Sequence, residues 1–232
     1  MKIMDFYKMF SLKTLILTDS LSLPRVKPEI VEQKNTWPII LKSFNYFDIS
    51  YLAIGGGTVD QLFDQGNNYY KAINPSILII QSGIVDCAPR AYSRLEKDII
   101  ISNKYLSKLF FNILPVTAIR KIRNINYTDK KHFEYYVNAF IDSFNESKIF
   151  WIGIIPAQPK YEKKLPGISN IIKAYNEIIE NNMIKTKNVF INTKEFPQNG
   201  TMSDFHHINE IGHSWIADKL IMMIQSKYEM KY

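Results

Sequence analysis

Short apolar runs recur along the chain, separated by longer segments with helical periodicity. The runs occupy residues 14–18, 49–54, 77–81, 149–155 and 189–192, and most are rich in Ile or Val on consecutive positions. Strands that are buried on both faces of a parallel sheet have this continuous apolar character. The pattern therefore predicts a central parallel sheet.

The segments between these runs carry apolar residues at spacings of three and four, which is typical of amphipathic helices. They span residues 60–73, 129–145 and 168–184, and a further helix closes the chain after Asn209. In that closing helix the expected core positions are Ile211, Trp215, Ile216, Leu220, Met223 and Ile224. Alternating strands and helices predict right-handed crossovers in a three-layer α/β/α sandwich, which we expect to be one domain over residues 1–232.

Residues 87–123 fit this alternation less well. The segment contains Pro89 and Pro115, with possible helices at Arg94–Ile101 and Leu106–Leu114. We interpret it as a helical insertion after the third strand, near the functional site.

Polar or glycine-rich residues follow three of the predicted strands and precede the closing helix. Thr18-Asp19-Ser20 follows the first run, Gly55-Gly56-Gly57 the second and Gly83-Ile84-Val85-Asp86 the third, and Asp204-Phe205-His206-His207 precedes the closing helix. Ligands of open parallel sheets bind at the carboxyl ends of the strands, so these positions are candidates for function. A helix cap or a plain turn is the alternative for the serine and glycine segments.

The residue types in these segments suit acyl transfer. A serine hydroxyl becomes a nucleophile when a base takes its proton, and an acid behind the base orients the imidazole. Ser20 supplies the hydroxyl, and the Asp-x-x-His spacing of Asp204 and His207 supplies the acid and the base. His206 lacks that spacing, and we expect His213 to have a packing or capping role.

Together, these four segments resemble the ordered sequence blocks of the SGNH (GDSL-type) hydrolases, over residues 14–213. The resemblance implies a flavodoxin-like sandwich in which Ser20 is the nucleophile, His207 the base and Asp204 the orienting carboxylate. It also implies oxyanion donors at the backbone amides of Ser20 and Gly56. Asp19, Gly57, Asp86 and Arg90 are expected to support the site or contact the substrate.

The chain departs from the family pattern at two positions. Thr18 stands where the first block usually begins with Gly, and Val85 stands where the third block usually has an Asn that donates to the oxyanion. Loss of one such donor costs roughly 10²–10³ in rate. Arg90 is a candidate substitute for this donor; without a substitute, we expect slow turnover or lost hydrolysis.

Composition and charge limit the partners. The formal net charge is +7, but no basic run alternates with aromatic residues, so we expect no nucleic-acid partner. No apolar run approaches the roughly 20 residues of a spanning helix, so we expect no stable membrane insertion. The first dozen residues lack a signal-peptide pattern and Cys87 is the single cysteine, which together predict a cytoplasmic protein. Histidines are few and lack ligand spacing, so we expect no metal and no cofactor.

These features favour an esterase or deacylase that removes a short acyl group, most simply acetyl, from a carbohydrate or related small molecule. In a cytoplasmic protein the substrates would be activated sugars or glycan precursors of polysaccharide biosynthesis. A carbohydrate O-acetyltransferase would use the same triad. Two candidate functions of a different class are a non-catalytic SGNH-like binding module and a nucleotide-binding flavodoxin-like protein. The sequence leaves the acyl group, the acceptor and the oligomeric state open.

Overall fold

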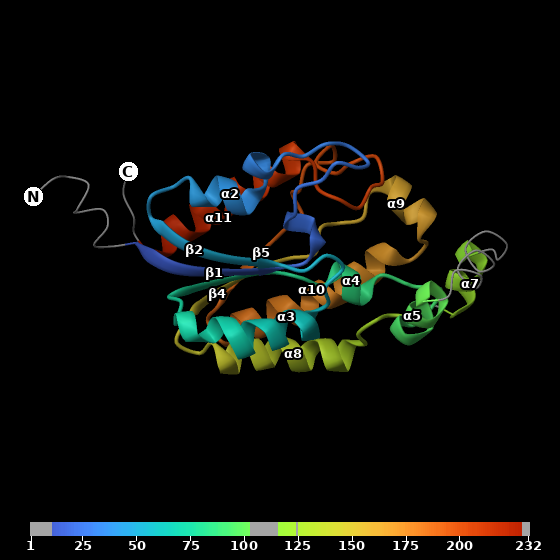
Figure 1. Ribbon diagram of the computed structural model, residues 1–232, viewed down its shortest axis with the longest axis horizontal. Coiled ribbons are helices and arrows are strands. Elements are labelled where there is room, and N and C mark those ends of the chain that lie inside the picture. Colours follow the sequence, from blue (N-terminus) through green and yellow to red (C-terminus); the bar gives the residue numbers. More distant parts are fainter. Residues whose placement is uncertain (1–10, 103–115, 124, 229–232) are drawn as a thin grey trace, which may run out of the picture.

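A parallel sheet of five strands, in the order β2-β1-β3-β4-β5, forms the centre of the protein (Figure 1). The computed structural model describes residues 11–102, 116–123 and 125–228. The strands are β1 (Leu12–Thr18), β2 (Phe47–Ala53), β3 (Ile77–Gln81), β4 (Lys148–Ile152) and β5 (Val189–Ile191). Each strand overlaps one of the apolar runs, so the predicted parallel sheet is confirmed.

All five strands end on one row of the sheet. Thr18 at the end of β1 pairs with Ala53 and Gln81, Gln81 pairs with Ile152, and Ile152 pairs with Ile191. The segments that follow the strands therefore leave the sheet at the same edge. This is the edge at which open α/β sheets bind their ligands.

The strand β4 ends three residues before the limit that its apolar run predicts. The Ile154 amide donates to Asn176 Oδ1 (2.7 Å), and Asn176 Nδ2 donates back to the Ile154 carbonyl (2.9 Å). Thr193 Oγ1 donates to the same carbonyl (3.0 Å). Side chains thus take the backbone groups that a neighbouring strand would pair, and the chain leaves the sheet.

Helices cover both faces of the sheet. They are α2 (Trp37–Lys42), α3 (Val59–Gln65), α4 (Ile84–Cys87), α5 (Arg94–Ser102), α7 (Val116–Arg123), α8 (Lys130–Ser143), α9 (Pro159–Lys164), α10 (Ile168–Lys185) and α11 (Glu210–Tyr228). The short turns are η1 (Ser20–Ser22), η2 (Gln33–Asn35), η3 (Gly66–Tyr70) and η4 (Lys71–Ile73). In Figure 1, α2 and α11 lie on one face, and α3, α8 and α10 lie on the other. The predicted three-layer α/β/α sandwich is confirmed.

The apolar stripe predicted for residues 129–145 forms part of the core. Phe133, Val137 and Phe140 of α8 are fully buried. The Phe140 ring meets the Trp151 ring of β4 edge to face, with centroids 5.6 Å apart. Burial of each such side chain contributes roughly 1.5–3 kcal/mol, so this contact fixes α8 on the sheet.

The helix predicted over residues 60–73 changes type along its length, because α3 ends at Gln65 and continues as the π-helical segment η3 and the 3-10 turn η4 to Ile73. A Cβ added at Gly66 would lie 2.5 Å from Leu17 Cδ1, so this segment passes too close to β1 for a larger residue. In α11, Ile211 and Met223 are exposed rather than buried.

The segment 87–123 contains α5, which was predicted, and α7, which was not. The two helices lie beside each other at one end of the molecule (Figure 1), joined by Arg123, which donates to both carboxylate oxygens of Glu96 at 2.8 and 3.0 Å. Arg94 of α5 donates to Thr58 Oγ1, which ties α5 to the loop after β2. The helix predicted at Leu106–Leu114 lies outside the described residues. The single-domain assignment stays a prediction.

None of the described helices is both long enough and apolar enough to cross a membrane.

Candidate active site

Ser20 lies directly after β1, in the first position of the turn η1. Asp19 caps this turn, since its Oδ1 accepts from the Leu21 amide at 2.8 Å. The Asp19 amide donates to the Gln81 carbonyl at 3.0 Å, which holds the turn against the end of β3. The predicted exit of the serine at the carboxyl edge of the sheet is therefore what the structure shows.

Hydrogen bonds among nearby hydroxyl groups hold the turn that carries Ser20. The Ser22 hydroxyl is hydrogen-bonded to Thr18 Oγ1 and, at 2.8 Å, to the Tyr51 hydroxyl of β2. Thr18 is fully buried. The threonine that replaces the usual glycine thus has a structural partner and lies away from solvent.

Asp204 and His207 form a close pair. His207 Nδ1 lies 2.5 Å from Asp204 Oδ2, and the His207 amide donates to Oδ1 at 2.9 Å. The His206 amide donates to the same Oδ1 at 3.0 Å. Burial raises the pKa of Asp204, but these hydrogen bonds outweigh it and lower the pKa to about 2. An ionised Asp204 requires the proton on Nδ1 and leaves His207 Nε2 as an acceptor.

Burial lowers the pKa of His207 below its usual value. The hydrogen bond to Asp204 raises this pKa in part, and the positive charge of Arg25 lowers it further. The neutral imidazole is therefore the form present near neutral pH. A neutral ring with a free Nε2 is the protonation state that a general base needs.

His206 occupies a different environment from His207. Its ring stacks on Tyr161 of α9, with centroids 5.8 Å apart, and meets the His207 ring at 4.5 Å. Burial lowers the pKa of His206 to about 3, and the charge of His207 contributes. Among the described residues, Asp204 hydrogen-bonds the ring of His207 and only the backbone amide of His206, and the base role of His207 stays a prediction.

Arg25 connects the serine turn with the histidine loop, and no sequence pattern indicates this role. Its Nη2 donates to the Ser20 carbonyl at 3.4 Å. Burial lowers its pKa, while the charges of Asp204 and Asp19 raise it, so the guanidinium lies near both carboxylates. Glu29, four residues further on, accepts from the Ser203 amide at 3.0 Å. The segment that carries Arg25 thus contacts both halves of the candidate site.

The structure brings Ser20 and the Asp204–His207 pair to one edge of the sheet, with Arg25 near both. Within the described residues, the Ser20 hydroxyl forms no hydrogen bond with His207. Catalytic contacts are often longer in the absence of substrate and tighten in the reacting complex. Transfer of the Ser20 proton to His207 stays a prediction.

The glycine segment after β2 contains a backbone amide, that of Gly56, that is free to donate a hydrogen bond. Gly56 has a φ of +68°, a conformation that other residues rarely adopt, and nothing lies within 4 Å of an added Cβ. The Gly57 amide donates to the Ile54 carbonyl at 2.9 Å and closes the turn. In the described part of the chain, the amides of Ser20 and Gly56 donate to no protein acceptor. The two amides are therefore free to donate, Gly57 closes the turn, and the oxyanion role of Ser20 and Gly56 stays a prediction.

Asp86 links three loops at the same edge. Its Oδ1 accepts from the Val59 amide (3.1 Å) and from Thr128 Oγ1 (2.6 Å), and its Oδ2 from Ser82 Oγ (3.4 Å). Burial raises the pKa of Asp86 to about 6, although the Thr128 and Val59 hydrogen bonds oppose the shift. Asp86 thus holds the glycine segment in place beside β3.

Arg90 belongs to the segment 87–123 and pairs through its backbone with Ile125. Its guanidinium lies over the Tyr127 ring, 5.2 Å from the centroid, and its buried Nε has no hydrogen-bond partner among the described residues. Its charge contributes to lowering the pKa of His206. A role as the substitute oxyanion donor stays a prediction.

Val85, Cys87 and His213 are core residues. Val85 is 4% exposed and belongs to the main apolar cluster. Cys87 is fully buried, and burial raises the pKa of its thiol far above the usual value. His213 Nδ1 accepts from the Trp37 amide at 3.2 Å, which agrees with the expected packing or capping role.

His132 has a partner that the sequence interpretation missed. Asp129 caps α8, its Oδ2 lies 2.7 Å from His132 Nδ1, and its Oδ1 accepts from the His132 amide at 3.0 Å. The Asp-x-x-His spacing therefore occurs twice in this chain. No group of three or more His, Cys, Asp or Glu side chains among the described residues could hold a metal ion.

Several solved structures share this architecture. The lipase/acylhydrolase from Enterococcus faecalis matches with a TM-score of 0.64 and 12% identity, over 93% of this chain and 96% of that one. A catalytic mutant of Axe2, an acetylxylan esterase from Geobacillus stearothermophilus, matches with a TM-score of 0.61 and 13% identity, over 91% and 93%. The chain has the fold of the SGNH hydrolases.

A second acetylxylan esterase, AlAXEase, matches with a TM-score of 0.61 and 13% identity, over 92% of this chain and all of that one. No protein-family model matches the sequence, and no curated protein matches it. The predicted SGNH fold is thus confirmed by structure, while the identities leave the activity and the substrate to be argued from the site.

Proposed function

We propose that this protein is a serine esterase that removes a short acyl group, acetyl in the simplest case, from a carbohydrate or related small molecule. The observation that carries the proposal is the Asp204–His207 pair, held at the same sheet edge as Ser20. The fold is shared with esterases and acylhydrolases, two of which are named as acetylxylan esterases.

In the proposed reaction, His207 Nε2 takes the proton of the Ser20 hydroxyl while the oxygen attacks the ester carbonyl. Asp204 keeps the imidazole in the required tautomer and stabilises the imidazolium that forms. The amides of Ser20 and Gly56 stabilise the negative charge on the carbonyl oxygen. His207 then donates its proton to the leaving alcohol, and a water molecule that it activates hydrolyses the acyl-serine.

The preference for a short acyl group rests on a narrow cavity beside the candidate nucleophile. It is lined by Leu21, Ile84, Ile154 and His206, among others, and has a volume of about 10 Å³. A cavity of that size holds roughly one water-sized group. An acetyl methyl fits this space, which supports the preference for a short acyl group.

Fluorophosphonate labelling with mass mapping tests the proposal. We expect an adduct on Ser20 in the wild-type protein and in Ser203→Ala, which replaces an exposed serine beside Asp204. We expect none in Ser20→Ala. Absence of any adduct on the folded wild-type protein would favour the non-catalytic binding module.

Hydrolysis of an aryl acetate, with and without glycan acceptors, separates esterase from transferase. Rapid acetate release that is independent of the acceptor supports the esterase. Slow release together with accumulation of acetylated sugar would instead establish the O-acetyltransferase.

A further inference from the structure

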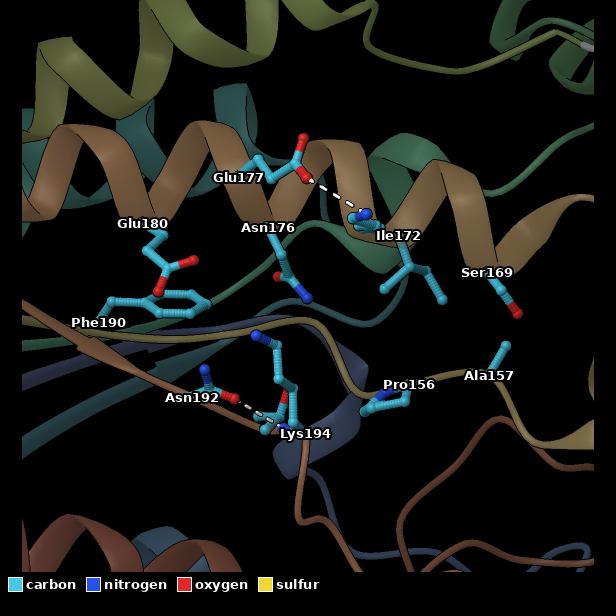
Figure 2. A pocket seen from close by; sticks show the side chains of 12 residues that line it. Pro156, Ala157, Ser169, Ile172, Asn176, Glu177, Glu180, Phe190, Asn192 and Lys194 are labelled. Carbon is cyan, nitrogen blue, oxygen red and sulfur yellow. Dashed lines mark hydrogen bonds and ion pairs between the residues drawn. The ribbon is translucent and has the colours of Figure 1, made fainter.

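A groove of about 300 Å³ lies at the same sheet edge, between α10 and the segments that follow β4 and β5 (Figure 2). Its lining includes Ile172, Glu177, Glu180, Phe190, Asn192 and Lys194. Figure 2 shows Ile172, Asn176 and Glu180 of α10 pointing toward the opposite side of the groove, which is formed by Phe190, Asn192 and Lys194. Its size matches sites that bind small molecules.

The lining combines an apolar surface with balanced charges. Ile172, Phe190, Pro156 and Ala157 provide the apolar part. The carboxylates of Glu177 and Glu180 are matched in number by the ammonium groups of Lys173 and Lys194. An ionic ligand of either sign would therefore meet repulsion as well as attraction. A neutral ligand with many hydroxyl groups avoids that cost, because each hydroxyl both donates and accepts.

The polar groups on the rim are available to a ligand. Lys173 Nζ lies 3.9 Å from Glu177 Oε1, a long contact between exposed side chains that contributes little stability. Within the described residues, the Glu180 carboxylate and the Lys194 ammonium have no hydrogen-bond or ion-pair partner. Several donors and acceptors thus surround an apolar surface that can contact the non-polar face of a sugar ring.

The groove adjoins the candidate active site. Pro156 and Ala157 line the groove and also the narrow cavity that contains Leu21 and His206. The loop that carries them is held by Asn176, whose amide makes both hydrogen bonds to the backbone of Ile154. The loop shared by the two spaces is therefore anchored to α10, and a substrate that extends past Pro156 and Ala157 would reach from one space to the other.

We infer that this groove is a distal binding site for a neutral, polyhydroxylated part of the substrate, such as the further sugar units of an acylated oligosaccharide. The inference rests on the proposed function, since it assigns to the acyl-bearing sugar the place beside Ser20. It adds that affinity depends on sugar units remote from the ester.

Binding of unacetylated oligosaccharides to the wild-type protein, measured by nuclear magnetic resonance titration, tests this inference. The probes are neutral cello- and xylo-oligosaccharides, from disaccharide to pentasaccharide, with oligogalacturonate as the anionic comparison. We expect affinity to increase with length in at least one neutral series. Glu177→Trp, which adds a bulky ring to the lining of the groove, and Glu180→Gln should each weaken pentasaccharide binding by about three- to tenfold.

Lys185→Trp is the matched control, because Lys185 is an exposed residue of α10 outside the groove lining. It should leave oligosaccharide binding unchanged. Turnover of an aryl acetate should be the same in all three variants, since this substrate does not reach the groove. Circular dichroism checks that each variant is folded.

The possible outcomes distinguish failure of the distal binding site from failure of the proposed esterase function. Aryl acetate turnover without oligosaccharide binding, or with binding that Glu177→Trp leaves intact, would overturn the distal site and leave the esterase standing. Oligosaccharide binding that depends on Glu177 and Glu180, in a protein with no turnover, would support the groove and overturn the proposed function. Tighter binding of oligogalacturonate than of every neutral probe would overturn the neutral class of ligand.

Discussion

His207 Nδ1 lies 2.5 Å from Asp204 Oδ2, and the backbone amide of the same histidine donates to Oδ1 at 2.9 Å. One carboxylate therefore holds both the ring and the main chain of His207. Rotation of the ring would break the side-chain hydrogen bond while the main chain stayed in place. This arrangement fixes the tautomer that leaves Nε2 free to accept a proton.

Asp204→Asn should lower kcat for an aryl acetate by about 10²–10⁴-fold, because the amide no longer stabilises the imidazolium or selects the tautomer. Initial rates at saturating substrate measure this effect. Asp129→Asn is the matched control, since Asp129 and His132 have the same spacing on the exposed surface of α8. Its kcat should stay within about twofold of the wild type. Equal losses in both variants would contradict a catalytic role for Asp204.

The pH dependence of kcat/KM should show a limb in which activity rises with pH. Since the general base works only as the neutral imidazole, activity appears as pH rises through the pKa of His207, which burial places below its usual value. The limb should therefore lie on the acid side of pH 6.5. His206→Gln should retain this limb, because His206 is already neutral there. Loss of the limb in His206→Gln would assign the base to His206.

Arg25→Gln should move this limb to higher pH. The positive charge of Arg25 lowers the pKa of His207, so its removal raises the pKa and makes the neutral base appear later as pH increases. We expect the shift to become smaller at high salt, because the charges are partly exposed. Lys185→Gln, on the exposed surface of α10, should shift nothing. A limb that moved to lower pH in Arg25→Gln would show that the sign of this interaction is wrong.

The two Asp-x-x-His sequences show what local spacing can predict. Asp129 and His132 make the same contacts as Asp204 and His207, because in both places a capping carboxylate meets the residue three positions later. The spacing alone therefore predicts the pair but not its function. Contacts between distant segments supply the difference, since Arg25 and Glu29 link the turn of Ser20 to the loop of Asp204, while Asp129 and His132 lie on the surface.

The strands, the strand exits and the amphipathic helices follow from apolar periodicity, which is local information. Arg25, Glu29 and Tyr161 could not be found this way, because their roles depend on contacts between segments far apart in the sequence. The role of Asn176 could not be found this way either. Its side chain binds the backbone of Ile154, 22 residues away in the chain, and so ends β4 early, which no run of apolar residues near Ile154 could indicate.

Asp19→Asn should stabilise the protein at neutral and alkaline pH. Complete burial raises the pKa of Asp19 from 3.8 to about 7, so the folded state binds a proton that the unfolded state has lost across that interval. The contribution of Asp19 to stability is therefore full below pH 3.8 and decreases as pH rises through about 7. Asparagine keeps an oxygen for the Leu21 amide and has no charge to bury.

Urea unfolding near pH 4 and near pH 8 measures this difference. We expect Asp19→Asn to gain about 1 kcal/mol or more relative to the wild type on going from the lower to the higher pH, since a single pKa unit corresponds to about 1.4 kcal/mol. Asp129→Asn provides the comparison, because Asp129 is an exposed capping carboxylate with a lowered pKa. A pH dependence of Asp19→Asn identical to that of the wild type would contradict a protonated Asp19 in the folded state.

Val85→Asn tests the position at which the family pattern has a donor. From the sequence alone, the expected result is unchanged or higher activity, because asparagine supplies the missing oxyanion donor. The structure adds a cost in stability, since Val85 is 4% exposed and lies in the apolar cluster. A buried amide without partners costs roughly 1–3 kcal/mol.

We therefore expect Val85→Asn to unfold at lower urea concentration while its kcat for an aryl acetate, measured where it is fully folded, stays equal to that of the wild type or rises. Val85→Ala is the control for lost packing, because it removes apolar volume without adding a donor. Its stability should fall by a similar amount with no gain in kcat. A large loss of kcat in folded Val85→Asn, absent from Val85→Ala, would mean that the valine shapes the acyl pocket and that backbone amides do not suffice for the oxyanion.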